Sequence, residues 1–185
     1  MRKVVSTLFI SLDGVVEAPD RWQSTWGDES AAALARALDT SDTVLLGRST
    51  YEMWAGYWPG YDGTDDAAFA DWINKAPKYV VSRTLDDVGE WPNSHLVKGD
   101  LAAAVGRLKE ADGKDIAVAG SPGLVASLLE RDLLDELALM INPVVAGGGL
   151  RRLFPGDATM KRLELVRAEP TSTGVILATY RRPQN

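Results

Sequence analysis

The chain has 185 residues, of which 45% are hydrophobic and 25% are charged, a composition typical of a globular domain rather than of a disordered chain. It contains no cysteine and one histidine, His95, which excludes disulfide bonds, thiolate metal sites and multi-histidine metal centres. The net charge of −6 without a long basic run disfavours nucleic-acid binding, and no apolar stretch is long enough to span a membrane. We expect one soluble, cytoplasmic domain over residues 1–185, without a metal.

The first half of the chain alternates apolar runs with helix-forming segments. A long loop with Gly14, Pro19 and Gly27 follows the first apolar run, and the next helix opens with acidic residues, as the helix dipole favours. Short, continuously apolar runs are typical of strands buried on both faces of a sheet. We expect strands at 4–10, 43–46 and 78–82, and helices at 28–38, from about 49, and at 66–74.

The second half continues the alternation and ends differently. A short strand is possible at 96–97, Asp100 is expected to cap a helix over 101–108, and a strand follows at 116–119. Ser121 is expected to cap the next helix, with Pro122 at its first position. We expect further strands at 136–145, 162–168 and 175–181, the last two as an antiparallel hairpin. The predicted fold is α/β: a mixed, mainly parallel sheet with helices on both faces and a C-terminal antiparallel hairpin.

The first candidate ligand site lies where the second predicted strand meets a helix. Gly47 would allow a ligand close to the backbone, and the helix start offers unpaired N–H groups. Ser49 and Thr50 add hydroxyls, and Arg48 can present a planar fork to a phosphate. An ordinary turn with a surface arginine explains these residues equally well.

Two further strand ends carry the same kind of residue. Gly120, Ser121, Pro122, Gly123 and Leu124 place two glycines at a helix start, which suits a pyrophosphate, although the segment is neither GxGxxG nor a P-loop. A well-capped helix is the plain alternative.

Ser82 and Arg83 combine a hydroxyl with a guanidinium after another strand. Ligands of open α/β sheets bind at the carboxyl ends of the strands, so the three junctions together favour one extended phosphorylated ligand.

Candidate substrate and proton-transfer residues lie in the loops. Trp26 and Trp54 could stack on a planar heterocycle, although packing against the core is the commoner use of such side chains. Gly148 could admit a ligand close to the backbone. Asp13 and Asp28 could each donate or relay a proton, but an acid at a helix start often only compensates the dipole.

Four motifs occur in an order that resembles a known family. They are Ser11–Val16 after the first strand, Leu46–Glu52 after the next, Ala119–Ser121 before a helix, and Asn142–Gly149. The chain resembles the dihydrofolate-reductase-like superfamily, and specifically bacterial proteins similar to the C-terminal reductase domain of bifunctional riboflavin-biosynthesis deaminase-reductases (the RibD C-terminal domain family). The resemblance spans nearly the whole length.

The resemblance implies a dihydrofolate-reductase-like fold, NADPH as the cofactor and a homodimer. It implies that residues 47–50 face the cofactor, with the arginine of this segment near the 2′-phosphate, and that residues 82–83 lie near the adenosine. Residues 120–124 would bind the pyrophosphate. Asp13 and the first loop would border the nicotinamide and the substrate, and Gly147–Gly149 would lie near the same pocket.

The resulting hypothesis is an NADPH-dependent oxidoreductase that transfers hydride to a small planar heterocycle, of pterin, flavin-precursor or pyrimidine type. The alternative is a protein of the same fold that binds a dinucleotide or a pterin without turnover, which the lack of a convincing proton donor favours. A hydrolase is disfavoured because the chain has one histidine and no GxSxG elbow. The missing deaminase half leaves a role in riboflavin synthesis open.

Overall fold

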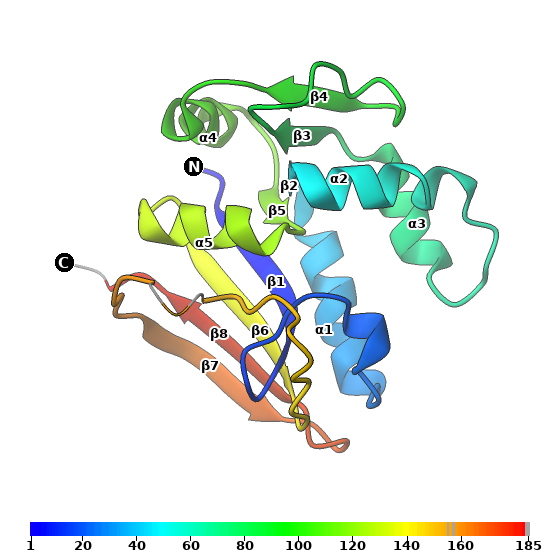
Figure 1. The fold of residues 1–185 in the computed structure, drawn as a ribbon, viewed down its shortest axis with the longest axis vertical. Coiled ribbons are helices and arrows are strands. Elements are labelled where there is room, and N and C mark those ends of the chain that lie inside the picture. The colour runs from blue at the N-terminus through cyan, green and yellow to red at the C-terminus, as the bar shows by residue number, and fades with distance from the viewer. Residues whose placement is uncertain (155, 157, 184–185) are drawn as a thin grey trace.

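The computed structural model describes residues 1–154, 156 and 158–183. Its strands are β1 (Val4–Ser11), β2 (Ser41–Gly47), β3 (Lys78–Val81), β4 (Ser94–Val97), β5 (Asp115–Val118), β6 (Glu136–Asn142), β7 (Glu164–Pro170) and β8 (Ile176–Arg181). They form one sheet in the order β4-β3-β2-β5-β1-β6-β8-β7 (Figure 1). From β4 to β6 the neighbours are parallel, whereas β8 is antiparallel to both β6 and β7. The predicted mixed sheet with its C-terminal hairpin is confirmed.

Helices cover both faces of this sheet. They are α1 (Asp28–Asp39), α2 (Arg48–Ala55), α3 (Ala67–Lys75), α4 (Leu101–Glu110) and α5 (Pro122–Glu130), with single 3-10 turns at Pro19–Arg21 and Trp58–Gly60. On one face Leu45 packs in a cluster with Val105 of α4 and Val125 of α5. On the other face Val44 packs in a cluster with Ile73 of α3. Successive side chains of β2 therefore pack into the cores on opposite faces of the sheet, which explains the continuous apolar run in its sequence.

Strand β6 is shorter than the sequence pattern predicts. We expected a strand over 136–145, and β6 ends at Asn142. The next residue, Pro143, has no N–H for a ladder. The Val144 N–H then turns back to the Asn142 carbonyl at 2.8 Å, and the Val144 carbonyl accepts from the Leu12 N–H at 2.8 Å. The end of the predicted strand thus leaves the sheet to join the first loop.

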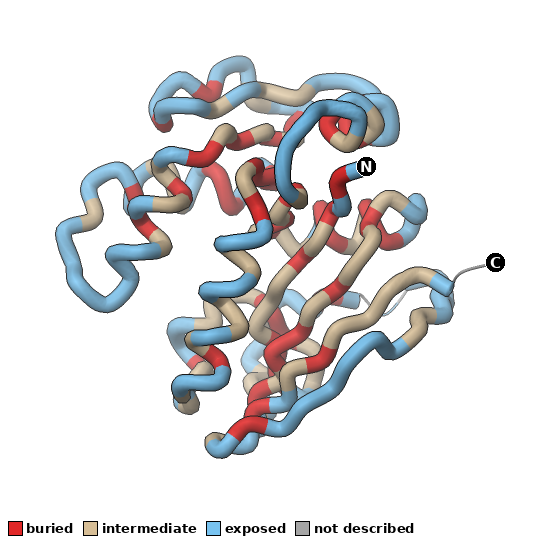
Figure 2. The backbone as a smooth tube through the Cα atoms, turned by 180° about the vertical axis from the view of Figure 1, so that it is seen from behind, coloured by how far each residue is buried: buried red, intermediate tan, exposed pale blue. Residues whose placement is uncertain are grey.

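The C-terminal hairpin lies at one edge of the sheet and is poorly covered. Figure 2 shows β7 as mainly exposed, in agreement with the exposure of all its residues after Glu164.

Among the described residues, no helix is both long and apolar enough to cross a membrane.

Candidate functional site at the carboxyl edge of the sheet

The parallel strands bring the predicted junctions to one edge of the sheet. In the strand order, β3, β2, β5, β1 and β6 are consecutive neighbours, so their carboxyl ends follow one another along that edge. The candidate residues lie at or shortly after these strand ends, in the same order: 82–83, 47–50, 120–124, 13–14 and 147–149. This edge is where open α/β sheets bind ligands.

A close contact along the edge joins the end of β2 to the start of α5. The Gly47 N–H donates to the Gly120 carbonyl at 2.8 Å, and the peptide bond between Gly120 and Ser121 is cis. A Cβ on Gly47 would lie 2.9 Å from the Ser121 backbone nitrogen and closer still to its hydroxyl. A side chain at residue 47 would fill this space, so glycine is required by packing.

Gly120 is constrained on the other side by Thr50. Its φ of +119° lies in the region that favours glycine, and a Cβ there would lie 2.9 Å from the Thr50 hydroxyl oxygen. Thr50 itself is buried in the first turn of α2. Residues predicted from separate motifs therefore form one close-packed group.

The start of α5 lies at the same place. Ser121 occupies the N-cap position but makes no side-chain capping bond; instead its carbonyl accepts from the N–H groups of Leu124 at 2.9 Å and Val125 at 3.1 Å. Pro122 has no N–H, and a Cβ on Gly123 would meet nothing within 4 Å. Among the described residues, the Gly123 N–H of this first turn has no backbone partner and lies beside open space, a position that suits an anion.

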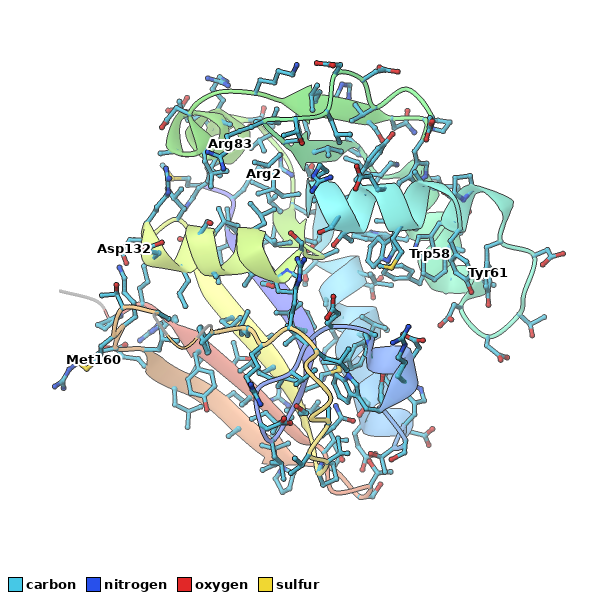
Figure 3. All side chains as sticks on the ribbon, viewed as in Figure 1. Arg2, Trp58, Tyr61, Arg83, Asp132 and Met160 are labelled. Carbon is cyan, nitrogen blue, oxygen red and sulfur yellow. The ribbon has the colours of Figure 1, made fainter. Side chains whose placement is uncertain are left out.

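The predicted cationic residues lie on the surface around this group. Arg48 is exposed and pairs with Glu52 one helical turn later, at 3.3 Å. Arg83 is exposed as well and is labelled in Figure 3 on the side of the molecule where α4 is drawn. Both guanidinium groups can move to meet a ligand.

The hydroxyls beside these arginines differ in how they are used. Ser49 is exposed. Ser82 is buried, and its hydroxyl accepts from the N–H groups of Thr84 at 3.1 Å and Leu85 at 3.0 Å. The Ser82 hydroxyl is therefore occupied by hydrogen bonds within its own turn, whereas the Arg83 side chain is exposed to solvent.

Asp13 joins two loops that are far apart in sequence. Its carboxylate accepts from the Ser11 hydroxyl at 2.7 Å and from the N–H groups of Ala146 at 2.9 Å and Gly147 at 3.0 Å. Arg152 contributes a weaker bond at 3.4 Å. The Ser11 hydroxyl and these backbone N–H groups hold the pKa of Asp13 well below its usual range.

Asp28 and its neighbour Glu29 open α1. Asp28 is exposed, whereas the Glu29 carboxylate accepts from the Ser172 N–H at 3.0 Å and the Ser172 hydroxyl at 3.1 Å. The Ser172 N–H is the main reason why the pKa of Glu29 is lowered. Glu29 ties α1 to the turn between β7 and β8, and Asp28 stays free to meet a ligand.

The predicted substrate residues separate in the structure. Trp26 is 48% exposed and lies 5.8 Å from the Phe9 ring of β1, between centroids. Trp54 instead belongs to an aromatic cluster, edge-on to Trp58 at 6.0 Å and to Phe69 at 5.7 Å. Figure 3 labels Trp58 beside α2 and α3. The Trp54 side chain therefore packs within this aromatic cluster.

The glycine segment after β6 has an unusual backbone. Gly147, Gly148 and Gly149 have φ angles of +58°, +68° and +73°, a run that other residues rarely adopt. Gly148 is exposed. The segment therefore presents bare backbone beside Asp13.

Two hollows lie elsewhere on the described part of the molecule. One hollow of about 260 Å³ lies around Arg2, Lys109 and Asp115, at the opposite edge of the sheet. Another, of about 230 Å³, lies between α1 and the face of β1, β6 and β8. Among the described residues, no three histidine, aspartate or glutamate side chains gather as metal ligands.

Sequence reasoning missed several contacts that build the site. The partners of Asp13 at Ala146 and Gly147, the Glu29–Ser172 link and the support from Arg152 each join positions more than 130 residues apart. The composition of the first loop and the glycine run marked both segments. The family resemblance placed both segments near one pocket, but no residue pattern predicted the individual bonds between them.

The arrangement of strands, helices and glycine contacts defines a dihydrofolate-reductase-like fold. The dihydrofolate reductase of Enterococcus faecalis, in a complex with NADP(H) and RAB-propyl, superposes with a TM-score of 0.64 over 98% of this chain and 97% of that one, at 13% identity. A candidate riboflavin biosynthesis protein of Shewanella sp. PV-4 superposes with a TM-score of 0.77 at 21% identity, covering 98% and 99% of the two chains.

The sequence narrows the class further. The family model of the RibD C-terminal domain matches residues 2–177, so the chain belongs to the RibD C-terminal domain family. The uncharacterized protein YyaP of Bacillus subtilis (strain 168) is 27% identical over 180 residues, covering 97% of this chain and 94% of YyaP. The family resemblance drawn from the motifs is confirmed.

Proposed function

We propose that the chain is an NADPH-dependent oxidoreductase that transfers hydride to a small planar heterocycle of pterin, flavin-precursor or pyrimidine type. The observation that carries this proposal is the Gly47–Gly120–Ser121 contact at the carboxyl edge, in a chain of the RibD C-terminal domain family. A dinucleotide is long, and the row of strand ends from β3 to β6 offers it successive contacts.

The residues at this edge fit the cofactor part by part. Gly47 and Gly120 let the end of β2, Thr50 of α2 and the start of α5 pack closely together, and the first turn of α5 can receive the pyrophosphate. Arg48 and Arg83 can pair with the 2′-phosphate and the adenosine end. When bound, NADPH would supply the hydride.

The protein's own contribution would be placement and exclusion of water. Trp26 and Gly148 can border the substrate. Trp54, a residue of α2, holds this helix in place through the aromatic cluster. Reduction of a ring C=N also needs a proton. Asp28 is exposed at the start of α1, and we propose that Asp28 or a water beside it supplies this proton.

A titration tests the cofactor. NADPH and, separately, NADH are added while tryptophan fluorescence and energy transfer to the reduced nicotinamide are followed. We expect saturable binding with a preference for NADPH. Arg48→Ala should reduce that preference roughly 10- to 100-fold, the worth of a hydrogen bond to a charged group. The exposed Arg107 of α4 provides the matched control, since Arg107→Ala should leave both affinities unchanged.

A non-catalytic binding protein on the same fold is the second candidate. The engaged carboxylate of Asp13 favours it, because one of the two candidate acids is already used in hydrogen bonding. Saturable NADPH binding without oxidation across a broad panel of heterocycles would support this candidate. If neither NADPH nor NADH binds, the reductase is contradicted.

We also propose a homodimer in the cytoplasm. Apolar side chains at the sheet edge support self-association, since Leu165 of β7 is 57% exposed and Ile176 of β8 is 42% exposed. Sedimentation should give a dimer for the wild type and a monomer for Leu165→Glu. A monomeric wild type would contradict the dimer, and cell fractionation tests the location.

A further inference from the structure

The carboxylate of Asp13 has no hydrogen-bonding capacity to spare. Its Oδ1 accepts from the Ser11 hydroxyl at 2.7 Å and the Ala146 N–H at 2.9 Å. Its Oδ2 accepts from the Gly147 N–H at 3.0 Å and the Arg152 guanidinium at 3.4 Å. Every partner is a donor. An asparagine in this place would turn an N–H₂ group toward at least one N–H or O–H donor, so only a charged carboxylate satisfies the set.

Asp13 lies in the middle of the contact between the first loop and the segment that follows β6. We call this contact the seam. On one side of it, the Leu12 N–H donates to the Val144 carbonyl at 2.8 Å, and on the other the Leu153 N–H donates to the Gly14 carbonyl at 2.9 Å. Between these two bonds, Asp13 is the acceptor that reaches the glycine segment. The glycines themselves bring no side chains with which to pack.

We propose that Asp13 is a positioning residue whose carboxylate holds the Gly147–Gly149 segment against the first loop, and so fixes the wall of the pocket in which hydride transfer takes place. The location of that pocket rests on the proposed reductase function, whereas the seam itself does not. Asp13 exchanges no proton with the substrate in this role.

The electrostatics of Asp13 agree with this role. The Ser11 hydroxyl, followed by the Ala146 N–H, lowers its pKa far enough that the carboxylate stays charged throughout the neutral range. A general acid must carry its proton at the working pH. A fixed anion, by contrast, needs to stay ionised in order to keep its donors.

Amide exchange tests the seam without any assay of activity. In ¹⁵N-labelled protein, Asp13→Asn should make the amides of Ala146 and Gly147 exchange at least about 10-fold faster, because each loses a charge-assisted bond. Asp20→Asn is the matched control: Asp20 is exposed in the same loop and has no side-chain bond among the described residues, so its substitution should leave both amides unchanged. Equal exchange in Asp13→Asn and the wild type would overturn the proposal.

Kinetics then test the link to the reaction. With NADPH and a substrate found by screening, Asp13→Asn should lower kcat by up to about 10²-fold, the scale of a small misplacement, with little change in the KM for NADPH. The pH profile of kcat should keep its shape. A wild-type kcat, or the loss of a titrating limb from the profile, would overturn the positioning role.

The two proposals fail in different ways. If the wild type binds no nicotinamide nucleotide, the proposed function fails, and the exchange rates of Ala146 and Gly147 still decide whether Asp13 holds the seam. If NADPH binds and is oxidised while Asp13→Asn leaves those amides unchanged, the reductase stands and the positioning role falls.

Discussion

At Gly47 the backbone of β2 comes so close to Ser121 that a methyl group has no room. The nearest backbone atom, the Ser121 nitrogen, would lie 2.9 Å from the new Cβ, and backbone cannot swing aside as a flexible side chain can. The backbone φ of Gly47 is −83°, which any residue can adopt, so the constraint is one of space alone. Glycine at residue 47 is therefore required by the packing of the site and not by the geometry of a turn.

Gly47→Ala should both destabilise the protein and weaken NADPH binding. Overpacking of this kind costs about 1–3 kcal/mol, and the shift of Ser121 would disturb the start of α5. Gly56→Ala is the control, because a Cβ there meets nothing within 4 Å and should change stability by less than about 0.5 kcal/mol. Urea unfolding and NADPH titration of both variants check this. Equal behaviour of the two would contradict the close contact.

Lys78 is a buried cation outside the site. Its side chain is fully buried, and its ammonium donates to the carbonyls of Ile73 at 2.9 Å and Ala76 at 2.8 Å, 4.6 Å above the Trp91 ring. Burial lowers its pKa from 10.5 to about 8. Lys78 thus closes the carboxyl end of α3 with its own charge.

Lys78→Met should destabilise the protein by about 1–3 kcal/mol below pH 8, because two buried carbonyls lose their donor. As the pH rises from about 8 toward 10.5, the folded wild type releases the lysine proton before the unfolded chain does. The unfolded chain then binds more protons, so the wild type should gain stability relative to Lys78→Met. Urea unfolding of both proteins below pH 8 and near pH 10.5 measures the difference. A difference independent of pH would contradict the lowered pKa.

At the scale of elements, the two helices on the same face begin in different ways. Asp100 caps α4 with its side chain, which accepts from the Ala103 N–H at 2.7 Å. Ser121 stands at the N-cap of α5 without such a bond, beside Gly47. The sequence predicted capping at both positions, and the side-chain cap is present only at α4. The first turn of α5, which has no side-chain cap, is the one that lies at the candidate site.

Asp100→Ala should therefore cost about 1 kcal/mol of stability, the usual worth of a side-chain N-cap. Ser121→Ala should cost less than about 0.5 kcal/mol, since no capping bond is lost. Thermal and urea unfolding of the pair provide the comparison. A larger cost at Ser121 than at Asp100 would mean that the Ser121 hydroxyl stabilises the start of α5 after all.

At the scale of the whole molecule, local patterns predicted the fold better than the site. Apolar runs such as Thr43–Leu46, set between helix-forming segments, were sufficient to predict a mainly parallel sheet, because each strand type follows from local residues. The same pattern misplaced the end of β6, where Pro143 and the bond from Leu12 to Val144 draw the chain away. That bond joins residues far apart in the sequence, so no local sequence pattern predicts it.

The site itself was predictable only in part. Glycines at strand ends indicate close approach of backbone, which is why residues 47 and 120 were recognised as a possible ligand site. Their contact with each other depends on β2 and β5 being neighbours in the sheet, a matter of topology. The partners of Asp13 and Glu29 depend on loops that meet only after folding. Residue types could therefore be predicted from the sequence, and their pairings could not.

The most direct test of the proposed function is to map the NADPH-induced changes in amide resonances along the whole chain. The account predicts the largest changes in residues 47–50, 82–84 and 120–124, which lie along the carboxyl edge of the sheet. Changes confined to the hollow beside α1, around Ala33, Ala37 and Thr179, or no changes at all, would contradict the assignment of the cofactor site.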